Sequence, residues 1–395
     1  MVREKQKWER VKLGEVCSIN APMVDPRNEQ YAFLPHIGNE SIEKQSGMLL
    51  SFRRAIDDNL VSGKYYFTEN DVLYGKIRPE LSKAAFPHFA GLCSADMYPI
   101  SCGNKIIPEF LKYTLLSYDL FKYTTSLSQR SGMPKVNRQE LMDFEFYLPD
   151  ISEQRAIVES LCEYDAEIKS MACLIQKMRN FKKSCIDQLI PRRNQSLPDM
   201  RMPGFEMDYK QKSAAELFIA FADKGFADLP VLMATQDKGM ILRDDSSIEI
   251  QHKISNEITY KRVLPGQFVI HLRSFQGGFA HSSVTGITSP AYTVFGFRDD
   301  SQNYDYYWRY LFCSESFINC LSNITYGIRD GRSISFRDFQ KMEFFVPSYK
   351  EQLAIGTYLK TIDEMITVEQ KKLEKYRNIK QGMMDDLLTG KIRLV

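Results

Sequence analysis

The chain has 395 residues, of which 44% are hydrophobic and 26% are charged, and its formal net charge is +2. This length and composition allow two domains with sizeable cores, and the balanced charge neither requires nor excludes a nucleic-acid partner. No apolar run reaches about 18 residues and the start MVREKQKWER is polar, so neither a membrane span nor a signal peptide is expected. The eight cysteines form no CxxC pair and are expected to be free thiols in a reducing cytoplasm, with no metal site.

In chain order, a first globular domain is predicted over residues 1–150. VSGKYYFTENDVLYGKI (61–77) alternates apolar and polar residues and is rich in aromatic and β-branched types, as short strands are. PEFLKYTLLSYDLFKYTTS (108–126) has helical spacing, and a polar loop with glycine follows over 127–141. FEFYLP (144–149) then ends the domain as a strand, so the domain is predicted to be α+β.

The first domain is followed by a long helix over 151–190, because no Pro or Gly interrupts residues 152–190. Residues 191–207 contain three prolines and few apolar residues, as linkers do. The second part of the chain has the same order, with a globular domain predicted over 208–347 and a second long helix with a tail over 348–395.

The two parts are an internal duplication. LPDISEQRAIV, which opens the first long helix, returns as VPSYKEQLAIG, with Pro149 and Pro347 198 residues apart. NDVLYGKIR matches PGQFVIHLR, where Arg78 and Arg273 are 195 residues apart, and KMRNFKKSCIDQL matches KYRNIKQGMMDDL at an offset of 198. The order of segments is the same in both parts, so we expect two similar domains related by a pseudo-twofold repeat.

Both long helices carry a narrow apolar seam with spacings of three and four residues, which is typical of a coiled coil. The seam is predicted to consist of Ile157, Leu161, Tyr164, Ile168, Met171, Ile175, Met178 and Leu189 in the first helix and of Ile355, Leu359, Ile362, Ile366, Leu373, Tyr376, Met383 and Leu387 in the second. Seams of matching length predict an antiparallel pair of about 38 residues per helix, roughly 57 Å long. The alternative is that each helix folds back on its own domain.

A lysine interrupts the seam at equivalent positions, Lys182 in the first helix and Lys380 in the second. One interpretation is a register mark, because a buried polar residue penalises slipped alignments of the two helices. The other is that each lysine extends its ammonium group to solvent.

Catalytic and nucleotide-binding signatures are missing from the sequence. It contains no G-x-x-x-x-G-K-[ST], no G-x-G-x-x-G after a strand and no G-x-S-x-G. Asp150 with Glu167 and Lys169 spells the PD…ExK pattern of metal-dependent nucleases, but Ile168 belongs to the helical seam, so this chemistry is not expected. We therefore predict no catalytic residue and no metal ligand.

Basic and polar side chains gather on loops that the duplication places at equivalent positions. The candidate DNA-binding residues are Lys76, Arg78, Lys83, Arg130, Lys135, Asn137 and Arg138 in the first domain and His271, Arg273, Gln276, Arg329, Arg332, Ser333 and Arg337 in the second. Arg, Lys, Asn and Gln are the side chains that hold phosphates and read base edges. Each of them alone could equally be a solvated surface residue, and an arginine repeated in a strand motif could serve packing.

In these motifs and their order, the chain resembles the specificity subunit of type I restriction–modification enzymes. The resemblance covers nearly the whole chain and rests on WERVKLGEV (8–16), DVLYGKIRPELSK (71–83), the glycine loop, LPDISEQRAIV (148–158) and DDLLTGKIRL (385–394). The start of the second domain, YKQKSAAEL (209–217), departs from the pattern because it lacks the Trp and the Leu-Gly-Glu.

The resemblance implies two target recognition domains, each reading one half of a bipartite site in double-stranded DNA, separated by two long antiparallel coiled-coil helices. The helices would set the spacer and dock two methyltransferase subunits, and restriction–translocase subunits would join the complex. The specificity subunit itself would be non-catalytic, with S-adenosylmethionine, ATP and Mg²⁺ bound by its partners. Because the two domains differ strongly in sequence, we expect the half-sites to differ.

Other functions remain open from the sequence. A coiled-coil scaffold with duplicated protein-binding domains would show no salt-dependent affinity for DNA. A self-contained nuclease would cleave DNA with Mg²⁺ and lose this activity on Glu167→Ala. A specificity subunit of a related restriction system of another type would differ only in its partners.

Overall fold

The computed structural model describes residues 8–128, 134–193, 195–235, 238–243, 254–321, 325–326 and 333–394. The chain forms two compact units, Met1–Met171 with Lys372–Val395 and Ala172–Lys371. Two long helices, α6 (Ile151–Leu189) and α12 (Tyr349–Leu388), each contribute one stretch to both units. No helix among the described residues is long and apolar enough to cross a membrane.

The described residues of the first unit form three sheets, with strand orders β1-β11, β2-β10-β7-β8 and β3-β6-β9-β4-β5. Their strands are β1 (Glu9–Lys12), β2 (Cys17–Ser18), β3 (Met23–Val24), β4 (Pro35–Ile37), β5 (Arg53–Arg54), β6 (Lys64–Phe67), β7 (Asp71–Gly75), β8 (Ala84–Ala85), β9 (Gly91–Cys93), β10 (Met97–Cys102) and β11 (Glu145–Leu148). The helices beside them are α1 (Leu13–Val16), α2 (Glu29–Ala32), η1 (Asn39–Ser41), η2 (Pro79–Leu81), α3 (Pro108–Leu115), α4 (Tyr118–Ser128) and α5 (Arg138–Met142).

The second unit repeats part of this plan, with strand orders β12-β23 and β13-β20-β17-β18 and three smaller pairs, β14-β15, β16-β19 and β21-β22. Its strands are β12 (Lys210–Ser213), β13 (Phe218–Phe221), β14 (Leu232–Thr235), β15 (Gly239–Leu242), β16 (Lys261–Val263), β17 (Phe268–Ile270), β18 (Ala280–His281), β19 (Gly286–Thr288), β20 (Thr293–Phe297), β21 (Thr325–Tyr326), β22 (Ser333–Ile334) and β23 (Glu343–Val346). The helices are α7 (Ala214–Leu217), η4 (Ile254–Thr259), α8 (Ser274–Gly277), η5 (Asp300–Gln302), α9 (Asp305–Phe312), α10 (Glu315–Leu321) and α11 (Phe336–Phe339).

The duplication is visible in the topology. The four-stranded sheet has the same strand order in each unit, and the two-stranded sheet joins the first strand of each globular part to its last. The five-stranded sheet of the first unit has no such counterpart among the described residues of the second. The predicted α+β fold class with an internal repeat is thereby confirmed.

The start of each long helix is fixed in the same way. The Asp150 carboxylate accepts a hydrogen bond from the Glu153 backbone N–H at 2.9 Å, so the aspartate that resembled a nuclease residue caps α6. Ser348 holds the equivalent place before α12, where its hydroxyl oxygen accepts from the Glu351 N–H at 3.4 Å. Glu167 lies exposed within α6 and not on a strand.

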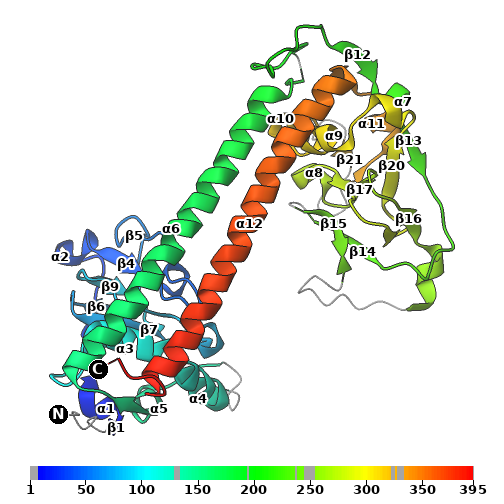
Figure 1. Ribbon diagram of the computed structural model, residues 1–395. Helices are drawn as coiled ribbons and strands as arrows, with labels where there is room; N and C mark the ends of the chain where they lie inside the picture. The colour runs from blue at the N-terminus through cyan, green and yellow to red at the C-terminus, as the bar shows by residue number, and fades with distance from the viewer. Residues whose placement is uncertain are drawn as a thin grey trace. The chain divides into compact units, whose positions relative to one another are not determined.

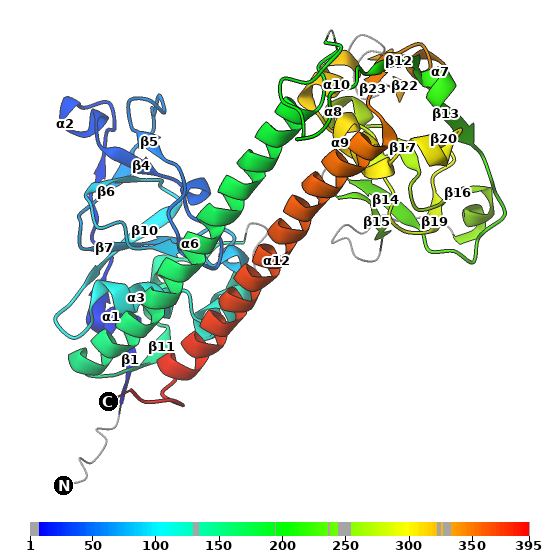
Figure 2. The same ribbon diagram turned by 45° about the horizontal axis from the view of Figure 1, so that its top comes forward.

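In the first unit, the start of α6 and the end of α12 run side by side in opposite directions and complete the core (Figure 1, Figure 2). Ile157 and Leu161 of α6 and Leu387 of α12 belong to the same buried cluster as Phe110 of α3. The helices therefore pair with each other and also pack on a globular part, so the two arrangements weighed from the sequence both occur.

The predicted seam residues are buried along most of both helices. Those less than 9% exposed are Ile157, Leu161, Ile168, Met171, Ile175, Leu189, Ile355, Leu359, Ile362, Ile366 and Leu387. Tyr164, Met178, Leu373 and Tyr376 are only half-buried, and the rings of Tyr164 and Tyr376 lie 6.2 Å apart. Near the end of α12 the prediction is wrong by one residue, because Met384 is buried while Met383 is only half-buried. The seam shifts there because the last turns of α12 pack on the first globular part as well as on α6.

Candidate nucleic-acid interface

The first candidate surface lies where β7 leaves the four-stranded sheet. The turn from Lys76 to Ser82 contains two residues in the left-handed region, Arg78 at φ 50° and Ser82 at φ 43°. Such conformations are strained for residues other than glycine and occur often at functional sites. The Arg78 side chain is exposed, and its backbone N–H donates to the Pro134 carbonyl at 3.0 Å, which holds the turn against the next loop.

Several predicted residues gather around this turn. Lys76 Nζ lies 5.1 Å and the Arg138 guanidinium 6.0 Å from the centre of the Tyr98 ring, so one aromatic ring contacts two cations. Lys135 is exposed and pairs in the backbone with Ile77. The structure thus places four predicted cations, those of residues 76, 78, 135 and 138, beside one another.

Two other predicted residues of the first unit have structural partners. Asn137 caps α5, where its side-chain oxygen accepts from the Glu140 N–H at 2.8 Å. The ammonium group of Lys83 donates to the Asn39 carbonyl and is half-buried, so it anchors the turn instead of facing solvent. Arg130 lies outside the described residues.

The second candidate surface follows β17, the repeat equivalent of β7. Leu272, Arg273 and Gln276 are exposed there, whereas Ser274 and Gly278 are buried. The Ser274 hydroxyl accepts from the His271 N–H at 2.8 Å, which ties the base of the loop. The loop therefore has a fixed base and an exposed tip that carries an arginine and an amide.

His271 differs from the expectation that it faces DNA. Its ring is buried, with 8% of the residue exposed, and Nδ1 accepts from the Arg273 N–H at 3.3 Å. The ring supports the loop that presents Arg273. Arg337 is exposed on α11, the side chain of Ser333 in β22 lies outside the description, and Arg329 and Arg332 lie outside the described residues.

Acid is expected to destabilise the second unit through His271. Burial, and next the charge of Arg273, lower the pKa of His271 to about 4 from an ordinary value of 6.5. Between these values the unfolded chain binds a proton that the folded chain does not, so this contribution is complete above pH 6.5 and is lost as the pH falls towards 4. The difference corresponds to about 3 kcal/mol. Chemical unfolding of wild type and His271→Gln at several pH values tests this. If the free energy of unfolding fell equally in both proteins between pH 6.5 and 4, the prediction would be wrong.

The Glu-Gln pairs that open the long helices are buried and join three segments each. The Glu153 carboxylate accepts from Trp8 Nε1 at 2.8 Å and pairs with the Arg393 guanidinium at 2.5 Å, while Gln154 holds the loop before α3 by accepting from the Ile107 N–H at 3.0 Å. Arg393 follows the end of α12, so the tail of one helix closes on the start of the other.

The second unit repeats this arrangement. The Glu351 carboxylate accepts from the Tyr209 hydroxyl at 3.0 Å and pairs with Arg201 at 2.7 Å, and Gln352 accepts from the Tyr304 N–H at 3.0 Å. Arg201 follows the end of α6. Both glutamates are 1% exposed, so they hold the helices in place and are not available to a partner protein. We name these two arrangements the helix-end clasps.

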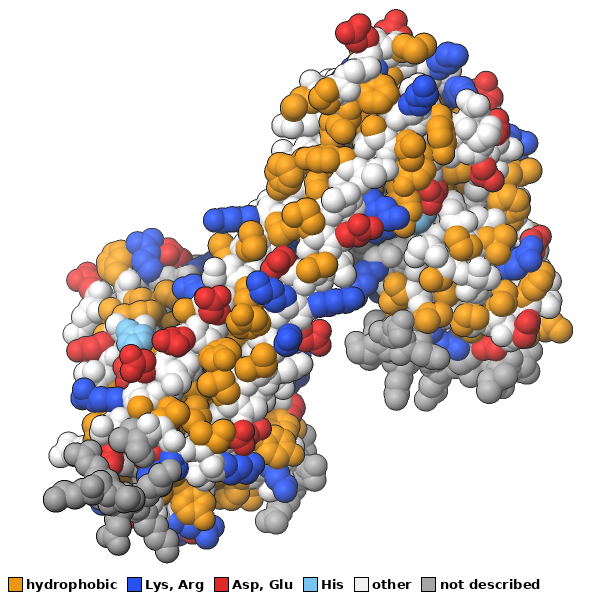
Figure 3. Space-filling model, in the orientation of Figure 1, with side chains coloured by type: hydrophobic (Ala, Val, Ile, Leu, Met, Phe, Trp, Pro, Cys, Tyr) orange, Lys and Arg blue, Asp and Glu red, His pale blue; other side chains and the backbone are white. Residues whose placement is uncertain are grey.

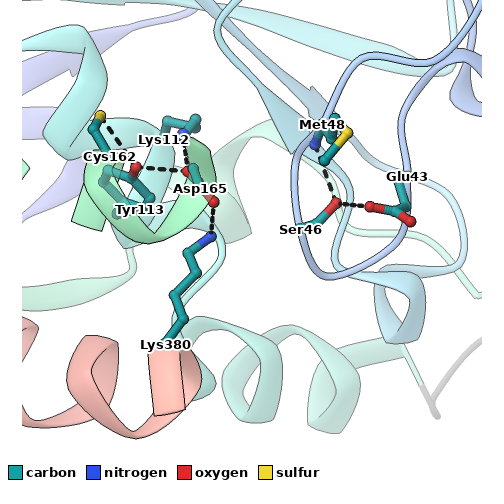
Figure 4. Close-up of polar contacts among 8 residues, drawn as sticks. All are labelled: Glu43, Ser46, Met48, Lys112, Tyr113, Cys162, Asp165 and Lys380. Carbon is teal, nitrogen blue, oxygen red and sulfur yellow. Dashed lines mark hydrogen bonds and ion pairs between the residues drawn. The ribbon is translucent and has the colours of Figure 1, made fainter. Parts of the chain in front are cut away.

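The lysines that interrupt the seam are ion-paired across the two helices. In the first unit Lys380 is 5% exposed and binds Asp165, which also accepts from the Tyr113 hydroxyl at 2.7 Å and pairs with Lys112 at 3.1 Å (Figure 4). Burial disfavours the charged form of Asp165, but the two lysines and the hydrogen bonds outweigh it and lower its pKa. The Cys162 thiol completes the group, 3.3 Å from the same hydroxyl.

An equivalent group lies in the second unit, where Lys182 pairs with Asp363 at 2.6 Å and Tyr310 donates to the same carboxylate at 2.8 Å. Because the tyrosine hydroxyl holds the carboxylate in place, the aspartate can pair with a lysine in one register of the two helices, as expected of a register mark. The aspartates were not singled out from the sequence. Their signal was the common offset of 198 that relates both Asp165 to Asp363 and Lys182 to Lys380.

Comparisons with known proteins agree with this geometry. Residues 5–178 match the family model of the type I restriction modification DNA specificity domain. The EcoDI type I restriction enzyme specificity subunit of Escherichia coli is 28% identical over 183 residues, 45% of this chain and 40% of that relative. The MjaVIII specificity subunit of Methanocaldococcus jannaschii is 24% identical over 422 residues, covering 100% of this chain and 95% of that relative.

By these matches the chain is similar to the specificity subunits of type I restriction–modification systems. Two solved structures share the fold over nearly the whole chain. A chain from a study of the assembly and conformational transition of a type I restriction–modification system has a TM-score of 0.60 at 18% identity, covering 99% of this chain and 100% of that one. The S subunit of the type I system of M. genitalium has a TM-score of 0.55 at 11% identity, covering 98% of each chain. At these identities the likeness concerns the fold.

Proposed function

We propose that this specificity subunit reads double-stranded DNA with two target recognition domains, each contacting one half of an asymmetric bipartite site. The observation that carries the proposal is the pair of equivalent loops after β7 and β17, each with an exposed arginine on a firmly held base. Exposed arginines and amides on rigid loops can read bases, while neighbouring lysines hold phosphates.

The proposal also covers the assembled complex. The subunit contributes no catalytic residue and binds no cofactor of its own, while two methyltransferase subunits and the restriction–translocase subunits, acting in the cytoplasm, supply the sites for S-adenosylmethionine, ATP and Mg²⁺. The paired helices set the spacer between the half-sites. They also dock the methyltransferase subunits.

A domain exchange tests the recognition function. Replacing residues 1–150 with those of a relative is expected to change one half of the methylated site and to leave the other half and the spacer unchanged. Mapping methylated adenines in a host with the wild-type or exchanged chain measures this. Changes in both halves would contradict the hypothesis that each domain reads its own half-site. A palindromic wild-type site would contradict the hypothesis that the two half-sites differ. If the DNA affinity of the assembled complex did not fall with salt, the alternative function, a coiled-coil scaffold with duplicated protein-binding domains, would be favoured.

Docking of the methyltransferase is expected to use apolar side chains exposed on the long helices. On the helix stretches in the second unit, Leu174 is 46%, Phe181 53% and Met365 53% exposed, and orange side chains follow the helices in the space-filling view (Figure 3). Contiguous exposed apolar side chains mark interaction surfaces.

Phe181→Asp is therefore expected to weaken association with the methyltransferase by at least tenfold, because a buried aromatic anchor contributes about 2 kcal/mol or more to an interface. Titration calorimetry of the two purified subunits measures it. Asn180→Asp, which adds the same charge at the neighbouring exposed position, serves as the control. Equal weakening by both variants would point to charge and not to the apolar contact.

A further inference from the structure

Two cysteine thiols face each other across β2 and β10 in the first unit. Cys17 and Cys102 are directly opposed in the strand register, and the Gly103 N–H donates to the Val16 carbonyl at 2.8 Å beside them. In an antiparallel ladder, a bond at this flanking position marks the cysteines as a non-hydrogen-bonded pair, whose Cα atoms lie about 4.5 Å apart. A disulfide spans Cα separations of about 4.4–6.8 Å, so the backbone is already positioned for one.

The two side chains differ in accessibility. Cys17 is 7% exposed, whereas Cys102 is only half-buried. The contact with Cys102 and burial raise the pKa of Cys17, which keeps that sulfur protonated at rest. Cys102 is therefore the sulfur that a dissolved oxidant meets first, and Cys17 is the neighbour that can resolve the product.

The equivalent positions in the second unit show which side chains can fill this part of the core. In the second unit the equivalent pair is Phe218 and Phe297, opposed in register with ring centres 5.3 Å apart. An apolar pair therefore fills the position. A cysteine can act as a small hydrophobic residue, but two facing cysteines can in addition react with each other. No other strand pairing in the described part of the chain opposes two cysteines.

We propose that Cys17 and Cys102 form a reversible disulfide when the protein meets small oxidised disulfides. The Cys102 thiolate attacks one sulfur of a disulfide such as oxidised glutathione, and one glutathione thiolate leaves. The Cys17 thiol then gives its proton to solvent, and its sulfur attacks Cys102 and releases the second glutathione thiolate. Two protein thiols are oxidised and one glutathione disulfide is reduced to two thiols.

The cross-link would act on the sheet that carries the β7 loop. β2 lies at the edge of the sheet β2-β10-β7-β8, where β10 is its one neighbour among the strands that the structure describes. A covalent bond between β2 and β10 would prevent this edge strand from separating. The oxidised protein is therefore expected to resist opening of the first globular part, with hydrogen exchange in β2 and β10 slowed and exchange in β13 and β20 unchanged.

The full-length chain, incubated with defined ratios of oxidised to reduced glutathione, tests the proposal. After alkylation and digestion, mass spectrometry is expected to find one peptide pair joined through Cys17 and Cys102 and lacking two hydrogens, which dithiothreitol reverses. Cys93→Ser should keep the linked pair. Cys17→Ser should abolish it and instead leave a glutathione adduct on Cys102.

The same experiment can overturn the proposal. If Cys162 and Cys173, which are exposed on α6, carry glutathione while Cys17 and Cys102 both remain alkylatable after unfolding, the pair serves packing only. A cross-link from Cys102 to any other cysteine would also refute it. The wild-type peptide map decides both points, so the conclusion does not depend on whether a serine variant folds.

Discussion

Arg393→Ala is expected to lower the free energy of unfolding of the first unit by about 3–5 kcal/mol, because it leaves a buried carboxylate without its cation. The Glu153 carboxylate is 1% exposed and receives two nitrogens of Arg393, at 2.5 and 2.6 Å. Without the arginine, the Trp8 Nε1–H alone, among the described side-chain contacts of Glu153, remains to compensate a charge that water cannot reach. Hydrogen exchange measured by mass spectrometry, peptide by peptide, reports the loss in each unit separately.

The helix-end clasps supply their own matched comparison. Arg201→Ala is expected to destabilise the second unit through Glu351 as Arg393→Ala destabilises the first. Arg155→Ala, which removes an exposed arginine two residues after Glu153, should change stability by no more than about 0.5 kcal/mol. If Arg393→Ala and Arg155→Ala had equal effects, the buried ion pair would not be what holds the tail.

Gly278→Ala is expected to displace the loop that presents Arg273 and to abolish reading of one half-site. Gly278 has φ 80° and ψ −165°, a region that only glycine occupies readily, at a cost of about 1–3 kcal/mol for other residues. An added Cβ would also lie 1.9 Å from the Phe312 carbonyl oxygen, a backbone atom of α9 that cannot turn aside. Mapping of methylated sites should show that the half-site read by the second domain is lost.

Gly382→Ala provides the control for this substitution. Gly382 lies in the exposed interior of α12, where an added Cβ would meet nothing within 4 Å. Alanine is better than glycine in a helix by roughly 0.5–1 kcal/mol, so this variant should be slightly more stable and should methylate the same site. Normal site recognition by Gly278→Ala would show that the loop tolerates a backbone shift and does not position the reading residues.

The seam of the long helices illustrates what could be predicted. Positions such as Ile157, Leu161 and Ile355 were recognisable because helical periodicity is local, and all three are buried. Met383 was misplaced because the last turns of α12 face a globular part as well as α6, and a heptad pattern describes only one facing helix. Lys380 was visible as an exception to the pattern, whereas its partner Asp165 was not.

The candidate DNA-binding residues also separate into those whose exposure the sequence predicted and those whose burial it did not. Arg78 and Arg273 were selected because they recur at equivalent positions, and the structure exposes both. His271 satisfied the same criterion and is buried, because a repeated position specifies the path of the backbone but not which side chain turns inward. Sequence composition also could not show that Lys83 is anchored by the Asn39 carbonyl, since the two residues are 44 positions apart.

By itself the sequence determined the duplication, the α+β class, the two long helices and the loops at which basic residues recur, because each of these rests on local periodicity or on direct repetition. Only the tertiary structure decided that the tail of each helix closes on the start of the other and that half-buried aspartates pair with the interrupting lysines. It also decided which loop residues are free to meet DNA. The helix closures and the lysine–aspartate pairs depend on contacts between segments more than 100 residues apart, such as Arg393 with Glu153, which no local pattern encodes.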